Sequence, residues 1–118
     1  MKRFSLISGE RSIHEYILRY LPQFREDLKN AVLYISDELL NPQAAADLID
    51  AAEKAILERI PTAEAFEQYH SRNDHKYPYY RIYVKNYIIF YVVIPEADKK
   101  VIEIRRFLYG KTNWHSKI

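Results

Sequence analysis

The stretch YRIYVKNYIIFY at residues 80–91 decides the fold class. Polar and apolar side chains alternate from Tyr80 to Lys85, which is the two-residue period of a strand with one buried face. Asn86 then provides a turn, and the more continuous apolar run from Tyr87 to Ile94 predicts a second strand. Residues 80–94 therefore predict a β-hairpin.

A third strand is predicted at residues 101–109, after a turn at residues 95–100. Upstream of the hairpin the apolar period changes to three and four residues, which predicts two helices. The first begins near Pro22, and its apolar stripe consists of Phe24, Leu28, Ala31, Val32, Ile35 and Leu39. Asn41 and Pro42 then start a second helix that runs to about Ile60, because Asn caps helices and Pro suits their first turn.

A short strand at residues 15–20 precedes the helices, and a polar surface loop at residues 62–78 follows them. This order predicts an α+β fold, in which an N-terminal helical hairpin packs on one face of a mostly antiparallel, about four-stranded sheet. We expect a single domain over residues 15–118, preceded by an N-terminal extension at residues 1–14.

The composition limits the classes of function. The 118 residues are 48% hydrophobic and 29% charged, which is ordinary for one globular domain. Disulfides, thiolate catalysis and cysteine-ligated zinc are excluded because the chain has no cysteine, and the four histidines lack the spacing of metal ligands. We expect no cofactor and no metal. No apolar run approaches the roughly 20 residues of a membrane helix, so we expect a cytoplasmic protein.

Charge is distributed unevenly along the chain, although the formal net charge is only +2. Residues 1–79 hold 10 Lys or Arg against 13 Asp or Glu, whereas residues 80–118 hold 8 against 3. The basic end is the place to look for an anionic partner, and a solvated basic face without a partner explains the same pattern equally well.

Alternation assigns the side chains of the first hairpin strand to faces. Ile82 and Val84 point to the helices, which leaves Arg81, Tyr83 and Lys85 on the open face of the sheet. Aromatic rings beside cations are typical of surfaces that contact RNA, because the rings stack on bases and the cations meet phosphates.

The last strand carries a charge on the helix-facing side. Glu103 and Arg105 share one face, and Arg106 shares the other with Ile102 and Ile104. Since an unpaired buried guanidinium is costly, Arg106 must be paired or lie at the sheet edge. We expect it to belong to a polar network or to a site.

A basic tail with an aromatic residue follows, from Tyr109 to Lys117. Trp114 and Tyr83 are candidates for contact with a nucleic acid or another target. Packing at the core or at a sheet edge remains the favoured explanation for both rings.

Several of these segments together resemble the RelE/ParE superfamily of bacterial toxins. The similar segments are Tyr20 to Leu28, LNPQAA at residues 40–45, the hairpin at residues 80–91, and VIEIRRFLYGK at residues 101–111. Their order matches the family from about Glu15 to Trp114, and the loop at residues 68–76 looks like an addition. The resemblance implies a toxin that arrests growth until a cognate antitoxin binds it.

The resemblance also implies two alternative activities on one fold. RelE-like members cleave mRNA in the ribosome with basic and acid/base side chains, without a metal, whereas ParE-like members poison DNA gyrase. The candidate catalytic residues of a nuclease are Arg81, Arg106, Tyr109 and Lys111. The candidate contacts to a target or nucleic acid are Tyr83, Lys85, Arg105 and Trp114.

Two departures from the nuclease pattern favour the ParE-like alternative. Ile88 stands where nuclease members carry an arginine after the hairpin tyrosine. The ending Tyr109-Gly110-Lys111 is similar to the His-Gly-Arg ending of ParE-like members. We therefore rank action on gyrase slightly ahead of ribosome-dependent mRNA cleavage. A third hypothesis is a partner-binding module that keeps the fold without toxicity.

Overall fold

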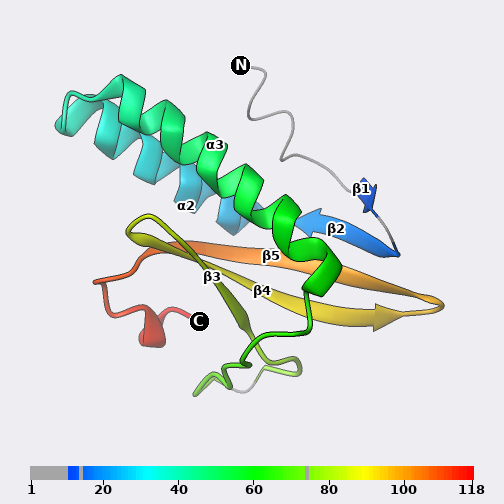
Figure 1. The fold of residues 1–118 in the computed structure, drawn as a ribbon. Helices are drawn as coiled ribbons and strands as arrows, with labels where there is room; N and C mark the ends of the chain where they lie inside the picture. Colours follow the sequence, from blue (N-terminus) through cyan, green and yellow to red (C-terminus); the bar gives the residue numbers. More distant parts are fainter. Residues whose placement is uncertain (1–10, 14, 74) are drawn as a thin grey trace.

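A helical hairpin covers one face of a twisted sheet (Figure 1). A computed structural model of the chain describes residues 11–13, 15–73 and 75–118. The helices are α2 (Pro22–Leu33) and α3 (Pro42–Arg59), joined through a π-helical segment η1 (Tyr34–Glu38). The strands are β1 (Arg11–Ile13), β2 (Tyr16–Tyr20), β3 (Tyr80–Val84), β4 (Tyr87–Glu96) and β5 (Lys99–Tyr109).

The sheet has the strand order β1-β2-β5-β4-β3. The β2–β5 pair is parallel, and the other three pairs are antiparallel, so the predicted α+β fold and mostly antiparallel sheet are confirmed. The fifth strand, β1, is three residues long and falls within the segment assigned to the N-terminal extension. The rest of that extension, residues 1–10 and 14, lies outside the described residues.

The second helix begins as its sequence predicts. The Asn41 side chain accepts a hydrogen bond from the backbone N–H of Ala44 at 3.1 Å, and Pro42 occupies the first helical position. The apolar stripe that follows is buried and consists of Ala45, Leu48, Ile49, Ala52 and Ile56. Of these, Leu48, Ala52 and Ile56 belong to the core between the helices and the sheet.

The end of the first helical stripe departs from the prediction. Phe24, Leu28 and Ala31 are buried, but Leu39 is 56% exposed. The wider turn of η1 is the cause, because its hydrogen bond from the Leu39 N–H to the Tyr34 carbonyl rotates the later side chains away from the 3.6-residue period. Leu39 therefore points away from the core.

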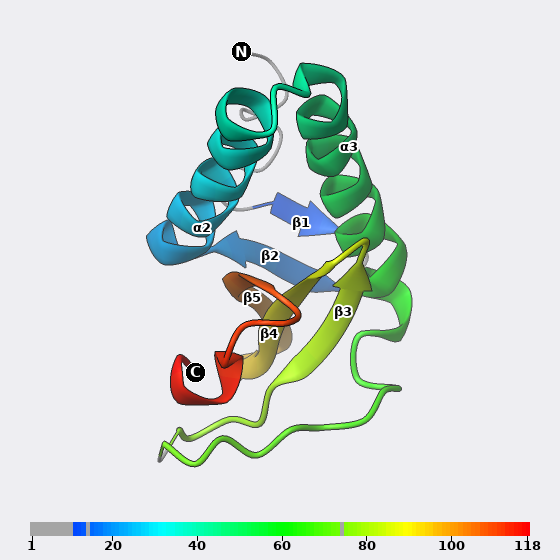
Figure 2. The ribbon, with the colours of Figure 1, turned by 90° about the vertical axis from the view of Figure 1, so that its left-hand side faces the viewer.

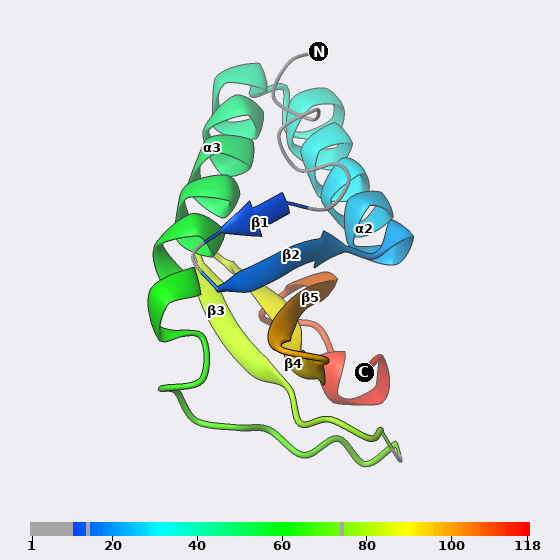
Figure 3. The ribbon, with the colours of Figure 1, turned by 90° about the vertical axis from the view of Figure 1, so that its right-hand side faces the viewer.

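The sheet carries a core on each face. Ile82 and Val84 face the helices as predicted, in a cluster that includes Leu18, Phe24, Leu48, Ile56, Ile89, Tyr91, Ile104 and Phe107. The opposite face, which alternation leaves open, is covered by a second cluster of Tyr79, Ile88, Phe90, Val92, Leu108, Trp114 and Ile118. The expectation of a bare face is wrong, because the tail and the long loop fold onto it (Figures 2 and 3).

The tail is held against the loop by polar contacts as well as by packing. We call residues 110–118, which include a 3-10 turn η3 (Trp114–Ser116), the C-terminal strap. The carbonyl of Ile118 accepts hydrogen bonds from the Ser71 hydroxyl, at 2.7 Å, and from the Asn73 amide. The Trp114 ring lies 5.0 Å from that of Phe90, centroid to centroid. The strap and loop thus close the second core together.

A second anchor fixes the start of the loop, which follows a 3-10 turn η2 (Ile60–Thr62). The Arg59 guanidinium lies 3.5 Å from the centroid of the Phe66 ring and donates hydrogen bonds to the Arg81 carbonyl and the Tyr91 hydroxyl, each at 3.1 Å. Tyr91 donates in turn to the Ala63 carbonyl at 2.6 Å. The loop predicted at residues 62–78 is irregular but fastened at both ends.

A β-bulge in β5 redirects its last residues. Tyr91 pairs with Ile104 and Phe90 pairs with Arg106, so one residue of β5 is inserted between the two pairs. Phe107, rather than Arg106, therefore follows Ile104 into the helix-facing core. This corrects the face that alternation assigns to Arg106.

The same bulge is tied to α2 by one carboxylate. Asp27 accepts hydrogen bonds from Nε and Nη2 of Arg106, at 2.7 and 3.2 Å, and from the Phe107 N–H at 3.0 Å. Arg106 is thus paired, as the cost of burying its charge requires. The third hydrogen bond of Arg106 goes from Nη1 to the Lys117 carbonyl at 3.0 Å, so the bulge, the helix and the strap meet here.

Replacing Asp27 by Ala should lower the free energy of unfolding by about 2–4 kcal/mol, because it leaves the part-buried Arg106 guanidinium and the Phe107 N–H without their partner. Urea unfolding measures the change. The matched control is Asp47→Ala on α3, whose exposed carboxylate accepts one hydrogen bond from Gln43 at 2.9 Å and should cost less than ~0.5 kcal/mol. Equal stability of the two variants would contradict the assigned role of Asp27.

Candidate functional site

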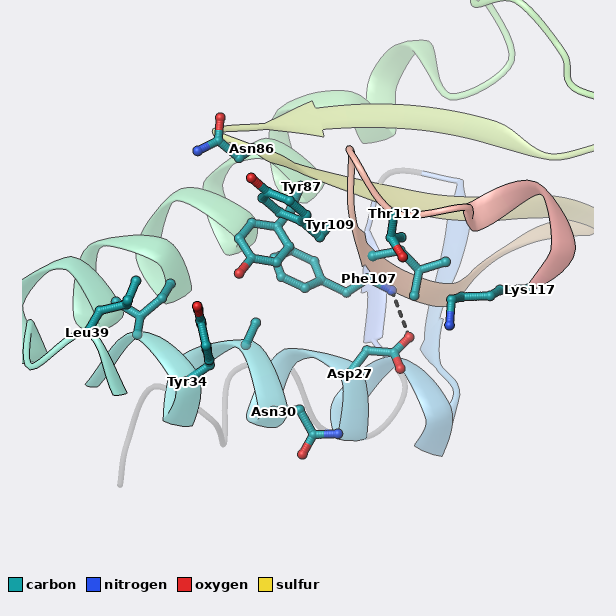
Figure 4. Close-up of a pocket in the computed structure, with 13 residues that line it drawn as sticks. Asp27, Asn30, Tyr34, Leu39, Asn86, Tyr87, Phe107, Tyr109, Thr112 and Lys117 are labelled. Atoms are coloured by element: carbon teal, nitrogen blue, oxygen red, sulfur yellow. Dashed lines mark hydrogen bonds between the residues drawn. The ribbon is translucent and has the colours of Figure 1, made fainter. Parts of the chain in front are cut away.

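A groove of about 650 Å³ opens between the helical hairpin and the sheet (Figure 4). Its helix side is formed by Asn30, Tyr34, Ile35 and Leu39, and its sheet side by Asn86, Tyr87, Phe107 and Tyr109. Tyr34 and Ile35 belong to the η1 segment and Leu39 follows it directly, so η1 supplies most of the helix side. We call this feature the tyrosine groove.

Aromatic rings form the wall of the tyrosine groove. The Tyr87 and Phe107 rings stack with their centroids 4.8 Å apart, and the Tyr109 ring meets Tyr87 edge-on at 5.6 Å. Burial raises the pKa of the Tyr87 phenol, and the neighbouring Tyr109 and Tyr34 raise it further. The hydroxyl therefore stays protonated and can donate a hydrogen bond to a bound partner.

Large apolar side chains gather at the rim. Tyr34, Leu39 and Tyr109 are 54%, 56% and 41% exposed, and Leu40 beside them is 81% exposed with a φ of 50°. A left-handed backbone is unfavourable for leucine, and an exposed leucine gains nothing from packing. An exposed apolar patch next to a groove is typical of a protein-binding site.

A smaller pocket of about 210 Å³ lies at the tip of the β3–β4 hairpin, which we call the hairpin end. Tyr83, Lys85, Ile88 and Lys111 line it. Gly110 closes it by donating from its N–H to the Asn86 carbonyl at 2.7 Å. A Cβ on Gly110 would lie only 3.2 Å from that carbonyl oxygen, so the close approach of the strap to the hairpin favours glycine.

The predicted site residues fall into separate places. Tyr83, Lys85 and Lys111 come together at the hairpin end, and Tyr109 lines the tyrosine groove. Trp114 is only 8% exposed beneath the long loop, so it packs rather than presents its ring. The remaining three predicted residues are Arg81, Arg105 and Arg106.

Each of these three arginines is paired with a carboxylate. Arg81 meets Glu67 at 2.8 Å, Arg105 meets Glu103 at 2.9 Å, and Arg106 meets Asp27 at 2.7 Å. Phe90 stands between two of them in the sheet, since it pairs with Arg81 on one side and with Arg106 on the other. Trp114 packs on Phe90, so apolar rings occupy the middle of the face.

Sequence reasoning missed the tyrosine groove. Leu39 belongs to the predicted helical stripe and Tyr87 to an apolar strand, so both are expected in a core, and Tyr34 falls outside that stripe. The groove arises only where α2 and η1 meet the end of β5, and the Asp27–Arg106 contact that joins them links residues 79 apart in the chain. In the sequence, the local sign of the groove is Leu40, a large apolar residue in the turn before Asn41-Pro42.

Neither a metal centre nor a membrane span is found in the part of the chain that the structure describes. No three His, Asp or Glu side chains gather there as ligands. No helix among residues 11–13, 15–73 and 75–118 is long and apolar enough to cross a bilayer.

The fold defines a small α+β protein in which a helical hairpin packs on one face of a mostly antiparallel sheet. Residues 18–114 match the family described as the ParE toxin of the type II toxin-antitoxin system parDE. The chain therefore belongs to the ParE toxin family, and the family implies a cognate antitoxin. A comparison with curated proteins gives no match.

Replacing Trp114 by Ala should lower the free energy of unfolding by about 3 kcal/mol, because it opens a cavity over Phe90 in the second core. The loosened strap should also expose the sheet, which dye binding to apolar surface detects. Trp114→Phe keeps most of the ring and should lose clearly less stability. If Trp114→Ala unfolds at the wild-type denaturant concentration, the strap does not cover this face in solution.

Proposed function

We propose that this toxin inhibits growth by binding DNA gyrase, and that it does not hydrolyse nucleic acid. The observation that carries the proposal is the Phe90–Trp114 pair at the centre of the sheet face opposite the helices. A nuclease has to hold a scissile phosphate between convergent cationic and acid/base groups. Apolar rings occupy that position, and Arg81 and Arg106 stand on opposite sides of them.

The hydrogen bonds that the arginine side chains already make support the same proposal. A guanidinium that binds a phosphate through two parallel hydrogen bonds must offer its fork to the ligand. Arg106 uses Nε and Nη2 on Asp27, and Arg105 uses Nε on Glu103. At Arg106, a phosphate would have to displace the Asp27 carboxylate, and that displacement would also release the bulge in β5.

Wild-type toxin should inhibit supercoiling by purified gyrase and cause double-strand breaks on induction, while mRNA remains intact. Supercoiling assays and mapping of mRNA 5′ ends after induction without antitoxin measure both outcomes. Full supercoiling at toxin excess, together with new mRNA ends at the ribosomal A site, would reject gyrase and establish the RelE-like nuclease alternative. Normal plating on induction would favour the non-toxic binding module instead.

The tyrosine groove is the surface that we assign to the antitoxin. Its exposed rim of Tyr34, Leu39 and Leu40 suits the apolar side of an amphipathic helix, and helices of this kind dock in apolar grooves. Lys117 at the strap end of the groove favours acidic residues on the other side of that helix. A segment ordered only on binding can wrap this surface.

Leu39→Asp should weaken antitoxin binding by more than tenfold, because it places a charge on the apolar rim. Co-purification and titration with the product of the neighbouring gene measure the effect, and the antitoxin should no longer rescue growth. Leu57→Asp is the matched control, since Leu57 is also exposed, at 36%, but lies on α3 outside the groove. Equal antitoxin affinity for the two variants would place the antitoxin elsewhere.

A further inference from the structure

The hairpin end combines three features that folding does not explain. Tyr83 is 66% exposed, although its ring could gain stability by packing. Lys85 has a φ of 53° at a hairpin position where Asn, Asp or Gly is preferred. Lys85 and Lys111 make no ion pair with any residue in the described part of the chain. Strained and exposed residues gathered at one spot point to a function.

The geometry keeps these side chains together. The Gly110–Asn86 hydrogen bond of 2.7 Å fastens the strap to the hairpin turn, which brings Lys111 beside Lys85. Ile88 forms the apolar floor of the pocket between them. The result is a preorganised surface with an aromatic ring, an apolar floor and two cations.

We propose that the hairpin end is the surface that contacts the toxin's target, and that it binds an acidic segment of a protein. Two lysines beside an apolar pocket complement a pair of carboxylates next to an apolar or aromatic side chain. A single-stranded nucleic acid instead requires a continuous track of cations along its backbone. The three arginines that could extend such a track are each paired with a carboxylate.

This assignment rests on the proposed action on gyrase and adds a means of neutralisation. Asn86 and Tyr87 line both the tyrosine groove and the hairpin end. An antitoxin helix in the groove therefore lies against the surface that the target needs. Occupation of the groove excludes the target without any contact to Tyr83, Lys85 or Lys111.

The test uses the full-length toxin with purified gyrase, comparing wild type with Tyr83→Ala and with the double variant Lys85→Glu/Lys111→Glu. Both variants should need at least ten times more protein for half-inhibition of supercoiling. Both should keep the wild-type affinity for the antitoxin and the wild-type unfolding midpoint. Lys99→Glu is the control, because Lys99 is exposed at the β4–β5 turn, at the other end of the sheet (Figure 1), and should inhibit like wild type.

Hairpin-end variants that inhibit gyrase as strongly as wild type would overturn the assignment and leave the proposed function intact. A wild-type protein without effect on gyrase would defeat the proposed function whatever the variants do. Binding of a single-stranded RNA oligonucleotide to wild type, lost in Lys85→Glu/Lys111→Glu while gyrase inhibition persists, would show that this surface serves RNA and would overturn the choice of a protein segment.

Discussion

The carboxylate of Asp27 holds strand β5 at the point where the strand changes its register. By accepting from the Arg106 guanidinium and from the Phe107 N–H, it joins the first helix to the bulge. The bulge sends Phe107 toward the helices and Leu108 toward the second core. Both cores, and the strap bonded to Arg106 through the Lys117 carbonyl, depend on this contact.

The partner surfaces follow from the same arrangement. Phe107 stacks on Tyr87 at 4.8 Å and forms the wall of the tyrosine groove. The strand ends at Tyr109 in the same groove, and Gly110 follows at the hairpin end. The middle of the sheet face opposite the helices is filled by Phe90 and Trp114 instead. The exposed Tyr109, Tyr83 and Lys111 thus lie around Asn86 and Tyr87, at the end of the molecule where we propose that both partners bind.

Much of the fold is predictable because its signals are local. The cap at Asn41, the turn at Asn86 and the two-residue alternation through Ile82 and Val84 each act within a few residues. The turn predicted at residues 95–100 is shorter than expected, because β4 continues through Pro95 and Glu96, and Ala97 takes the left-handed conformation at the turn.

Other features depend on contacts that the sequence pattern does not contain. The two-residue alternation of a regular strand does not show where a bulge occurs. It therefore predicts that Arg106 faces the helices, whereas Phe107 faces them. Helical periodicity assumes a regular α-helix and does not include the π-helical segment η1. It therefore predicts that Leu39 is buried, whereas Leu39 is exposed. The polar composition of the tail gives no indication that Trp114 and Ile118 pack on the sheet. Of the candidate site, the sequence names Tyr83, Lys85 and Lys111 as separate candidates, but their meeting at the hairpin end and the tyrosine groove both need tertiary structure. Hydrogen–deuterium exchange on the toxin, alone and with each partner, shows whether both partners bind at this end of the molecule. We expect antitoxin to protect amides at residues 30–40 and 107–109, and gyrase to protect those at residues 83–88 and 110–111. Protection confined to residues 69–79 and 114–118, over the Phe90–Trp114 face, would contradict it.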